Sequence, residues 1–204
     1  MIGWAPDSLI WPDVLNWSTT GQVSPPATMA DQCQYSTLRY FPSNYKALNQ
    51  SKFCYNLAAT AGNFYLIRAS FWYGSSTALG TTRSSGTIRF HVIVDTYEGV
   101  EIAINLPQTY PWFEEMYIRA LSGKDSIAVC LSAASDSSDV PFISSLELRP
   151  LPPTMMSVQV IQNISYALRT VVRQDSGTSS ANPPVLRSVY KLITYKSGQY
   201  NLHS

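Results

Sequence analysis

Aromatic side chains near the ends of the expected strands are the residues of this sequence best suited to binding a ligand. Aromatic rings stack on the apolar faces of sugar rings, while neighbouring amides and carboxylates hydrogen-bond the hydroxyl groups. The candidate rings are Trp72, Tyr73, Tyr97, Tyr110 and Trp112, and the candidate polar partners are Asp95 and Asn105. The same rings would also serve to pack loops against the strand ends, and the sequence leaves both roles open.

Acidic side chains give a weaker indication of catalysis. Glu114 and Glu115, with Asp95 and Glu98 upstream, contain the carboxylate pair that glycoside hydrolysis requires. Adjacent residues of a strand point to opposite faces, however, so Glu114 and Glu115 cannot act together on one glycosidic bond. We therefore rank an enzyme acting on glycans last among the function classes and predict no catalytic residues.

The sequence contains no clear metal site. His91 and His203 are the only histidines and lie far apart, and no His–Cys spacing typical of zinc is present. The acidic segment SAASDSSDVP contains Asp136 and Asp139, which offer oxygen ligands for calcium, but we favour a solvated loop. We predict neither a metal nor a cofactor.

The composition indicates an extracellular β domain that has no nucleic-acid partner. Of the 204 residues, 13% are charged and 12% are aromatic, and the formal net charge is +1. No basic stripe is present, which excludes the electrostatic footprint of a nucleic-acid-binding protein. A surface with few charges and many rings suits uncharged ligands such as sugars.

Secretion is indicated by three N-x-[ST] sequons, at Asn16, Asn49 and Asn163, which we predict to be glycan acceptors. The N-terminal segment MIGWAPDSLIWPD does not read as a signal peptide, so we expect that peptide to be absent from this chain. No run of about 18 apolar residues occurs, so we expect no membrane contact by the chain itself. The three cysteines allow at most one internal disulfide.

Short alternating segments predict an all-β fold. Residues 87–95 place Ile88, Phe90, Val92 and Val94 on one face, which is the period of a half-buried strand. Further strands are expected at 37–41, 53–57, 65–73, 100–106, 112–120, 126–132 and 142–151. Their spacing and the Gly-, Ser- and Pro-rich connections are typical of a β-sandwich or jelly roll.

The segment YLIRASFWYG, residues 65–74, departs from this alternation because large side chains lie on both of its faces. Tyr65, Ile67, Ala69 and Phe71 lie on one face, and Leu66, Arg68, Ser70 and Trp72 lie on the other. A half-buried strand would leave one of these faces to water. The sequence does not say what the second face contacts.

The pattern changes after residue 151. Pro150, Pro152 and Pro153 interrupt strand pairing and indicate a stiff linker. Residues 157–174 and 185–195 are expected to contain further strands, but about 50 residues do not easily form an independent core. The tail either packs on the first domain or belongs to a second domain that is incomplete.

Five motifs occur in order along the chain: LRYFP (38–42), FCYNL (53–57), YLIRASFWYG (65–74), VCL (129–131) and PFISSLELRPL (141–151). This ordered set closely resembles the malectin-like domain, the extracellular part of many plant receptor-like kinases, often beside leucine-rich repeats. The resemblance implies a malectin-like jelly-roll β-sandwich at residues 1–151. Residues 152–204 would be a linker and a partial second half, since the stretch from Tyr166 to Arg187 resembles the opening of such a half. The chain lacks the family's initial Cys-Gly strand and has no leucine-rich repeat, membrane span or kinase domain, so we expect a truncated ectodomain fragment.

The resemblance also assigns roles to individual residues. It implies that YLIRASFWYG is a central strand, with Arg68 under a loop and paired with a carboxylate. Trp72 and Tyr73 would emerge at the end of this strand, near the loops where animal malectin holds its sugar. Cys54 and Cys130 both lie in family motifs and are the expected disulfide, which leaves Cys33 as the odd thiol.

The function implied by the resemblance is that of a non-catalytic extracellular recognition module of a receptor-like kinase. Such a module would bind a carbohydrate, or a peptide or protein ligand, with a co-receptor as a further partner. The alternative is a structural protein–protein interaction domain without a sugar ligand. The expected location is the cell surface, as part of the ectodomain of a single-pass membrane protein.

Overall fold

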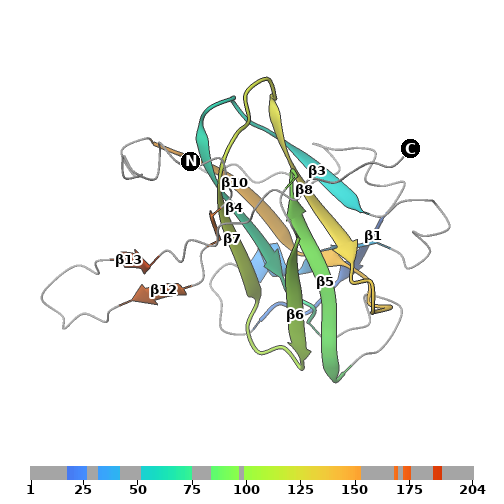
Figure 1. Ribbon diagram of the computed structural model, residues 1–204. Coiled ribbons are helices and arrows are strands. Elements are labelled where there is room, and N and C mark those ends of the chain that lie inside the picture. The colour runs from blue at the N-terminus through green and yellow to red at the C-terminus, as the bar shows by residue number, and fades with distance from the viewer. Residues whose placement is uncertain are drawn as a thin grey trace, which may run out of the picture.

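The computed structural model describes most of the central part of the chain (Figure 1). The described residues are 18–26, 32–41, 52–74, 84–96 and 99–152, together with the short strands at 168–169, 172–175 and 186–189. The three sequons at Asn16, Asn49 and Asn163 lie outside the described residues, as do Tyr97 and His203.

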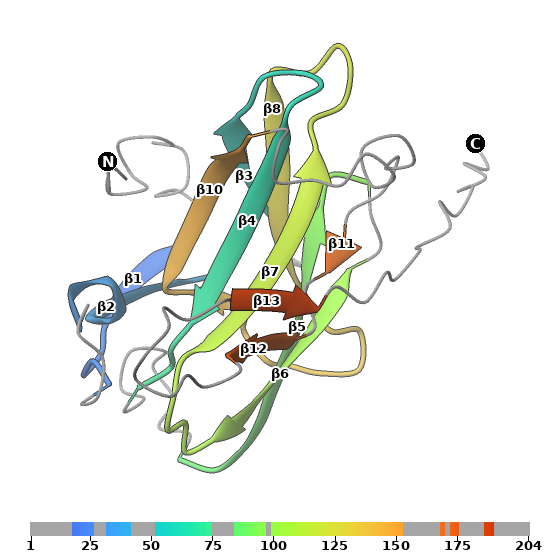
Figure 2. The same cartoon turned by 90° about the vertical axis from the view of Figure 1, so that its left-hand side faces the viewer.

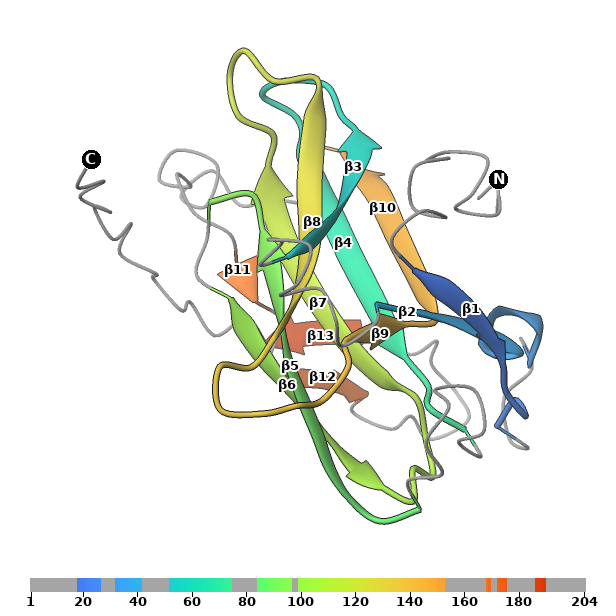
Figure 3. The same ribbon diagram turned by 90° about the vertical axis from the view of Figure 1, so that its right-hand side faces the viewer.

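Two four-stranded antiparallel sheets form a sandwich. One sheet has the order β10-β4-β7-β11, with β10 (Ser145–Leu151), β4 (Phe64–Phe71), β7 (Trp112–Arg119) and β11 (Leu168–Arg169). The other has the order β3-β8-β5-β6, with β3 (Phe53–Ala58), β8 (Ser126–Ala133), β5 (Gly86–Val94) and β6 (Val100–Leu106). Figure 2 shows the outer face of the first sheet, and Figure 3 shows the second sheet in front of it. The predicted all-β class and most of the predicted strands are therefore confirmed.

A smaller sheet closes one side of the sandwich. It consists of β1 (Thr19–Gln22), β2 (Thr37–Tyr40) and β9 (Phe142–Ile143), and a 3-10 helix, η1 (Gln32–Tyr35), precedes β2. The segment between β1 and η1 brings Val23 close to the core, where it donates its N–H to Ser36 O at 2.9 Å. The described N-terminal residues, 18–26 and 32–41, are thus attached to the sandwich.

The core between the sheets follows from the alternation of the strands. In β5 the side chains of Ile88, Phe90 and Val92 are buried, and the residues between them are partly exposed. Aromatic rings fill the centre in tilted or edge-to-face contacts: Phe90 lies 5.3 Å from Phe71 and 5.5 Å from Phe142, between ring centroids. Such packing adds a directional term to burial, which stabilises one arrangement of the two sheets.

The second face of β4 is also covered, which answers the question raised by YLIRASFWYG. Phe64, Leu66 and Ser70 point away from the inter-sheet core, yet they are 6%, 6% and 1% exposed. The hairpin of β12 (Val172–Asp175) and β13 (Leu186–Val189) lies on this side of the sheet, in front of β7 in Figure 2, and the Arg119 guanidinium lies 5.7 Å from the Phe64 ring centroid. A strand that is buried on both faces does not show the period-2 pattern of a half-buried strand.

Arg68 lies in a row of charged residues that crosses this outer face. It is opposite Glu147 on β10 and Glu115 on β7, and its Nε donates to Glu115 Oε1 at 2.6 Å. The expected carboxylate partner is confirmed. The pair lies between the two central strands of the sheet, β4 and β7, on its outer face. Arg149 pairs in turn with Glu147, so both buried carboxylates have a cation beside them.

Part of the tail joins the sandwich. In β11, Leu168 pairs with Tyr117 and Arg169 with Met116, which extends the first sheet at its edge. These two tail residues therefore contact the first domain. Within the described part of the chain, no helix has the length and hydropathy needed to cross a bilayer.

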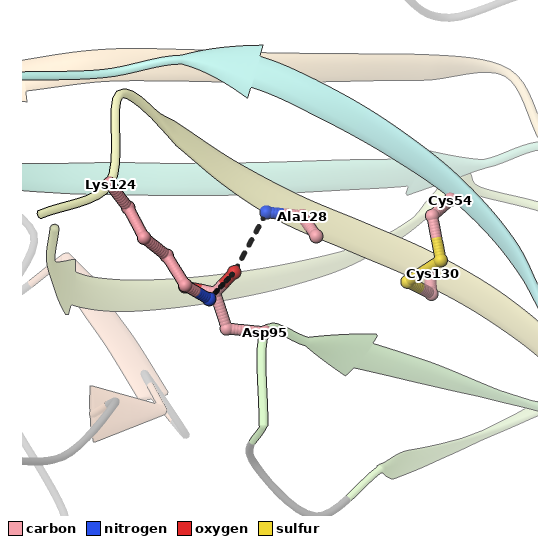
Figure 4. The surroundings of a disulfide bond; sticks show 5 residues. All are labelled: Cys54, Asp95, Lys124, Ala128 and Cys130. Atoms are coloured by element: carbon pink, nitrogen blue, oxygen red, sulfur yellow. Dashed lines mark hydrogen bonds and ion pairs between the residues drawn. A yellow bond between two sulfur atoms is a disulfide. The ribbon is translucent and has the colours of Figure 1, made fainter. Parts of the chain in front are cut away.

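The predicted disulfide between Cys54 and Cys130 is present. The two residues lie directly opposite each other on β3 and β8, on the outer side of the second sheet (Figure 4). The bond therefore joins strands that the hydrogen-bond ladder already pairs. Cys33 lies in η1, and its side chain is outside the description.

Candidate ligand-binding surface

The structure divides the predicted binding residues between the two ends of the sandwich. Asn105, Tyr110 and Trp112 lie where β6 ends and β7 begins, at the lower end of the molecule in Figure 1. The end of β4 is at the same place, because Phe71 pairs with Trp112, so Trp72 and Tyr73 also lie there. Asp95 follows β5 and lies at the opposite end. It is therefore not brought together with the other described candidates.

Exposed aromatic side chains gather at the lower end. Among the described residues, four large apolar side chains are exposed, and three of them are Tyr110 at 67%, Trp112 at 40% and Phe113 at 40%. We call these three residues the aromatic rim. The fourth, Leu121, follows the other end of β7. Phe113 was not predicted as a candidate, because the side chains of adjacent strand residues such as Trp112 and Phe113 point to opposite faces.

The loop that carries the rim is attached to the sandwich by one side chain. Gln108 Oε1 accepts the backbone N–H of Tyr73 at 2.9 Å, and Gln108 Nε2 donates to Phe71 O at 2.9 Å. The amide therefore replaces a missing strand partner at the end of β4. Pro111, between Tyr110 and Trp112, is buried and gives the loop a second point of attachment. Sequence reasoning missed Gln108, because a glutamine in a loop carries no signal of burial.

The expectation that Trp72 and Tyr73 emerge as exposed rings is wrong. Trp72 is 6% exposed and Tyr73 is 1% exposed. The N-terminal segment crosses the end of β4, and Trp72 Nε1 donates to Ser24 O at 2.8 Å. The approach is so close that a Cβ at Gly74 would lie 3.0 Å from Val23 Cβ and 3.2 Å from Ser24 O. Gly74 also has a φ of +62°, which side chains disfavour, so the glycine allows this crossing.

Asn105 stands on the exposed side of β6, near the end of that strand. Thr87 Oγ1 donates to Asn105 Oδ1 at 2.7 Å across the β5–β6 pair. This bond orients the amide, so that its nitrogen remains available as a donor to a hydroxyl group. The arrangement gives the lower end a neutral polar group beside its exposed rings.

Glu114 and Glu115 do not form a catalytic pair. Both are buried, at 3% and 7% exposed, and they point to opposite faces of β7. Glu115 binds Arg68 on the outer face, whereas Glu114 shares the inner face with Met116 and Ile118. The two carboxylates are therefore separated by the sheet, as their adjacency in sequence predicted.

Asp95 holds the end of β5 to β8. Its Oδ1 accepts the N–H of Ala128 at 2.9 Å and lies 3.8 Å from Lys124 Nζ (Figure 4). Its backbone has a φ of 51°, in a region that Asp and Asn tolerate better than most residues. The side chain is 2% exposed, and Oδ2 is buried without a hydrogen-bond partner among the described residues. In this conformation Asp95 closes a turn and presents no surface for a sugar hydroxyl.

The acidic loop after β8 is anchored by Arg89. The guanidinium binds Glu101 Oε1 at 2.6 Å and Asp136 Oδ2 at 2.8 Å, and the backbone N–H of Arg89 donates to Asp139 Oδ2 at 2.8 Å. Hydrogen bonds from Arg89 lower the pKa of Glu101 and of Asp136, and the two carboxylates raise the pKa of Arg89. The loop is therefore held to the sheet, although the Asp136 side chain stays 62% exposed to solvent.

Metal binding finds no support in this loop. In the part of the chain that the structure describes, no group of three His, Cys, Asp or Glu side chains could hold a metal ion. Asp136 and Asp139 use their oxygens to bind Arg89, so neither is arranged with other oxygen ligands around a common point.

The comparisons with known proteins agree with this fold. The profile of the malectin-like domain family matches residues 4–191, and the chain belongs to this family. A probable LRR receptor-like serine/threonine-protein kinase of Arabidopsis thaliana, At1g67720, is 27% identical over 170 residues. The match covers 80% of this chain and 16% of that protein. A second such kinase of the same plant, MEE39, is 30% identical over 132 residues, which are 65% of this chain and 13% of that protein.

Solved structures show the same architecture. The ANX2 ectodomain of Arabidopsis thaliana superposes with a TM-score of 0.53 and 15% identity, over 78% of this chain and 40% of that one. The plant receptor-like kinase FER gives a TM-score of 0.50 and 20% identity over the same shares. At this level of identity the likeness shows the fold alone. As a malectin-like domain, the chain is a non-catalytic recognition module of the kind found in the extracellular part of receptor-like kinases.

Proposed function

We propose that this chain is the ligand-recognition part of a receptor-like kinase ectodomain, and that it binds carbohydrate through the aromatic rim. The observation that carries the proposal is that three rings are exposed by 40% or more at one strand end: Tyr110 in the attached loop, and Trp112 and Phe113 on the two faces of the start of β7. A large ring that stays exposed does not stabilise the fold by burial. Several such rings at one place therefore indicate an interaction site. Asn105, oriented by Thr87 near the end of β6, would supply a neutral hydrogen-bonding group at the same end of the sandwich.

The attachment of the loop supports a role in binding. Gln108 fixes the loop to the end of β4 through two hydrogen bonds, so its backbone is ordered before a ligand arrives. Preorganisation lowers the entropy that binding must overcome. Trp72 and Tyr73 would support the loop and would not contact the ligand. Their buried side chains fill the end of the sandwich beside the loop.

The proposed location is the cell surface, with the domain exposed to the extracellular space. The domain would comprise residues 1–151, and residues 152–204 would form a linker and part of a second malectin-like half. Glycans on Asn16, Asn49 and Asn163 would lie on surfaces other than the ligand face. These assignments follow from the sequence motifs and from the receptor-like kinases that share the family.

The test is a binding screen of the secreted, glycosylated chain on a broad oligosaccharide array. Tyr110→Ala and Trp112→Ala are each expected to weaken sugar binding by about five- to thirtyfold, since one stacked ring contributes about 1–2 kcal/mol. Leu121→Ala is the matched control, because Leu121 is exposed to 36% at the opposite end of β7.

The opposite result has a clear meaning. A folded protein, verified by circular dichroism, that binds no sugar on the array would contradict carbohydrate recognition. Binding of a peptide or a co-receptor that depends on Trp112 would then identify the rim as a protein contact. Binding without dependence on the rim would favour the structural interaction domain.

A further inference from the structure

Strand β6 forms one edge of the second sheet. It is the last strand in the order β3-β8-β5-β6, and among the described residues it pairs only with β5 (Figure 1). An edge strand presents backbone N–H and C=O groups to which another extended chain can bond. Proteins commonly protect such edges with Pro or Lys, and Val100–Leu106 contains neither. By contrast β10, at the edge of the first sheet, contains Arg149 and Pro150.

The strand register shows which backbone groups of β6 face outward. The N–H of Arg89 on β5 donates to Asp139 Oδ2, in the loop on the other side of β5, so it points away from β6. Arg89 lies opposite Ala103, and residues that bond across an antiparallel pair alternate with residues that do not. The N–H and C=O of Ala103 therefore point away from β5. The same holds for Glu101 and Asn105, two residues to either side, and all three side chains are exposed on the outer face of the sheet.

The outer face beside this edge has an excess of negative charge. The Arg89 guanidinium donates to Glu101 Oε1 and Asp136 Oδ2, and the Arg89 backbone N–H donates to Asp139 Oδ2, so three carboxylates share one cationic residue. His91, opposite Glu101, counts as neutral at pH 7. The Glu101 and Asp136 side chains are 41% and 62% exposed, and a carboxylate accepts several hydrogen bonds, so both can bind a further cation. The other edge of the sheet, β3, contains no charged residue and does not select a partner by charge.

We propose that the edge of β6 binds an extended basic peptide segment, which adds to the second sheet as a further strand. The outward backbone groups of Glu101, Ala103 and Asn105 form the strand hydrogen bonds, which supply the affinity. Glu101 pairs with a Lys or Arg directly opposite, which supplies the selectivity. A second copy of this chain is a less suitable occupant, because it would bring a second acidic cluster onto the same face. This site is separate from the aromatic rim and goes beyond the proposed carbohydrate recognition.

The experiment measures the binding of fluorescent octapeptides to the full glycosylated chain by fluorescence polarisation at pH 7.5. All peptides alternate Val with Thr, which is the pattern of an extended strand. The basic probe has Lys at one central Thr position, the acidic probe has Glu there, and the neutral probe keeps Thr. We expect the basic probe to bind at least about fivefold more tightly than the acidic probe. High salt should reduce this difference, because Glu101 and Asp136 are exposed to solvent.

Ala103→Pro is the decisive variant, because it removes an outward N–H and leaves the bonds to β5 in place. It should weaken binding of the basic probe at least about tenfold, through the lost donor and the bulk of the ring. Ala103→Ser is the matched control, since it keeps the N–H and should bind as the unchanged chain does. Glu101→Gln keeps every backbone group and should reduce the preference for the basic probe, so it tests the edge even if the proline variant does not fold.

The outcomes decide between the possible occupants of the edge. Equal binding of the basic probe to folded Ala103→Pro and Ala103→Ser would overturn the assignment to β6, as would the absence of binding by every probe to folded chain. Equal affinity for the basic and acidic probes would overturn the selection by charge. A chain that is dimeric by light scattering and becomes monomeric in Ala103→Pro would show that a second copy, and not a basic peptide, occupies the edge.

Discussion

Gln108 provides the most informative perturbation, because it links the ligand loop to the fold. Gln108→Ala would leave the N–H of Tyr73 and the carbonyl of Phe71 without their partners. Both residues are at most 1% exposed. An unsatisfied buried backbone group costs about 1–3 kcal/mol, so the two together cost about 2–6 kcal/mol. We expect a loss of about 3 kcal/mol in the free energy of unfolding, since water reaches the half-buried loop and replaces part of the bonding.

The assay is equilibrium unfolding in urea, followed by tryptophan fluorescence, on the full chain. Thr109→Ala is the matched control: Thr109 is the exposed neighbour of Gln108, and its truncation should change stability by less than about 0.5 kcal/mol. Equal stability of the Gln108→Ala and Thr109→Ala variants would refute the reasoning, because it would mean that neither backbone group depends on the Gln108 amide.

Gln108→Glu extends the same test to the direction of the hydrogen bonds. One carboxylate oxygen still accepts from Tyr73 N–H, but the other faces the carbonyl of Phe71 and repels it. This variant should be destabilised at neutral pH and should recover stability as the carboxyl group becomes protonated in acid, when it again donates to Phe71 O. A loss of stability that does not change with pH would show that Nε2 makes no significant bond.

Three further predictions concern the cross-links of the sandwich. Replacing Cys54 and Cys130 by Ser should lower the free energy of unfolding by about 4 kcal/mol, because the chain-entropy model depends on their separation of 76 residues. A loss below about 1 kcal/mol in urea unfolding would contradict that account. Arg68→Met or Glu115→Gln alone should each lower the free energy of unfolding by about 3–5 kcal/mol, because each leaves the other buried charge without its partner. In a double-mutant cycle, the double variant should lose less stability than the sum of the two single losses. Additive losses would show that the two groups are independent. The two carboxylates bound by Arg89 have a folded pKa below their ordinary values of 4.5 and 3.8, so they stabilise the fold above those values and this stabilisation is lost as the pH falls below them. Arg89→Met should flatten that part of the stability–pH curve, and an unchanged curve would argue against the ion pairs.

Much of the fold could be predicted from the sequence because the relevant signals are local. Ile88, Phe90 and Val92 alternate with polar residues, and this period alone places them on one face of a strand. Gly and Pro between such segments mark where strands end. The Cys54–Cys130 pairing came from family motifs, and the structure confirms it because the motifs lie on adjacent strands.

The exposure of the candidate binding residues was predicted only in part. Tyr110 and Trp112 are exposed where their loop was expected, whereas Trp72 is buried and Asp95 lies at the other end. Their roles in binding remain predictions, as do the role of Tyr97 and the domain boundary at residue 151.

The sequence by itself determined the strands, the all-β class and the family, because each depends on the order of neighbouring residues. Only the tertiary structure decided which strand ends are covered and which are open. Trp72 is buried because the distant segment at Val23 and Ser24 crosses it, and Gln108 acquires its role because Phe71 and Tyr73 lie beside it. Contacts between residues 35 to 50 positions apart leave no periodic pattern in the sequence, so burial at a strand end cannot be read from the strand.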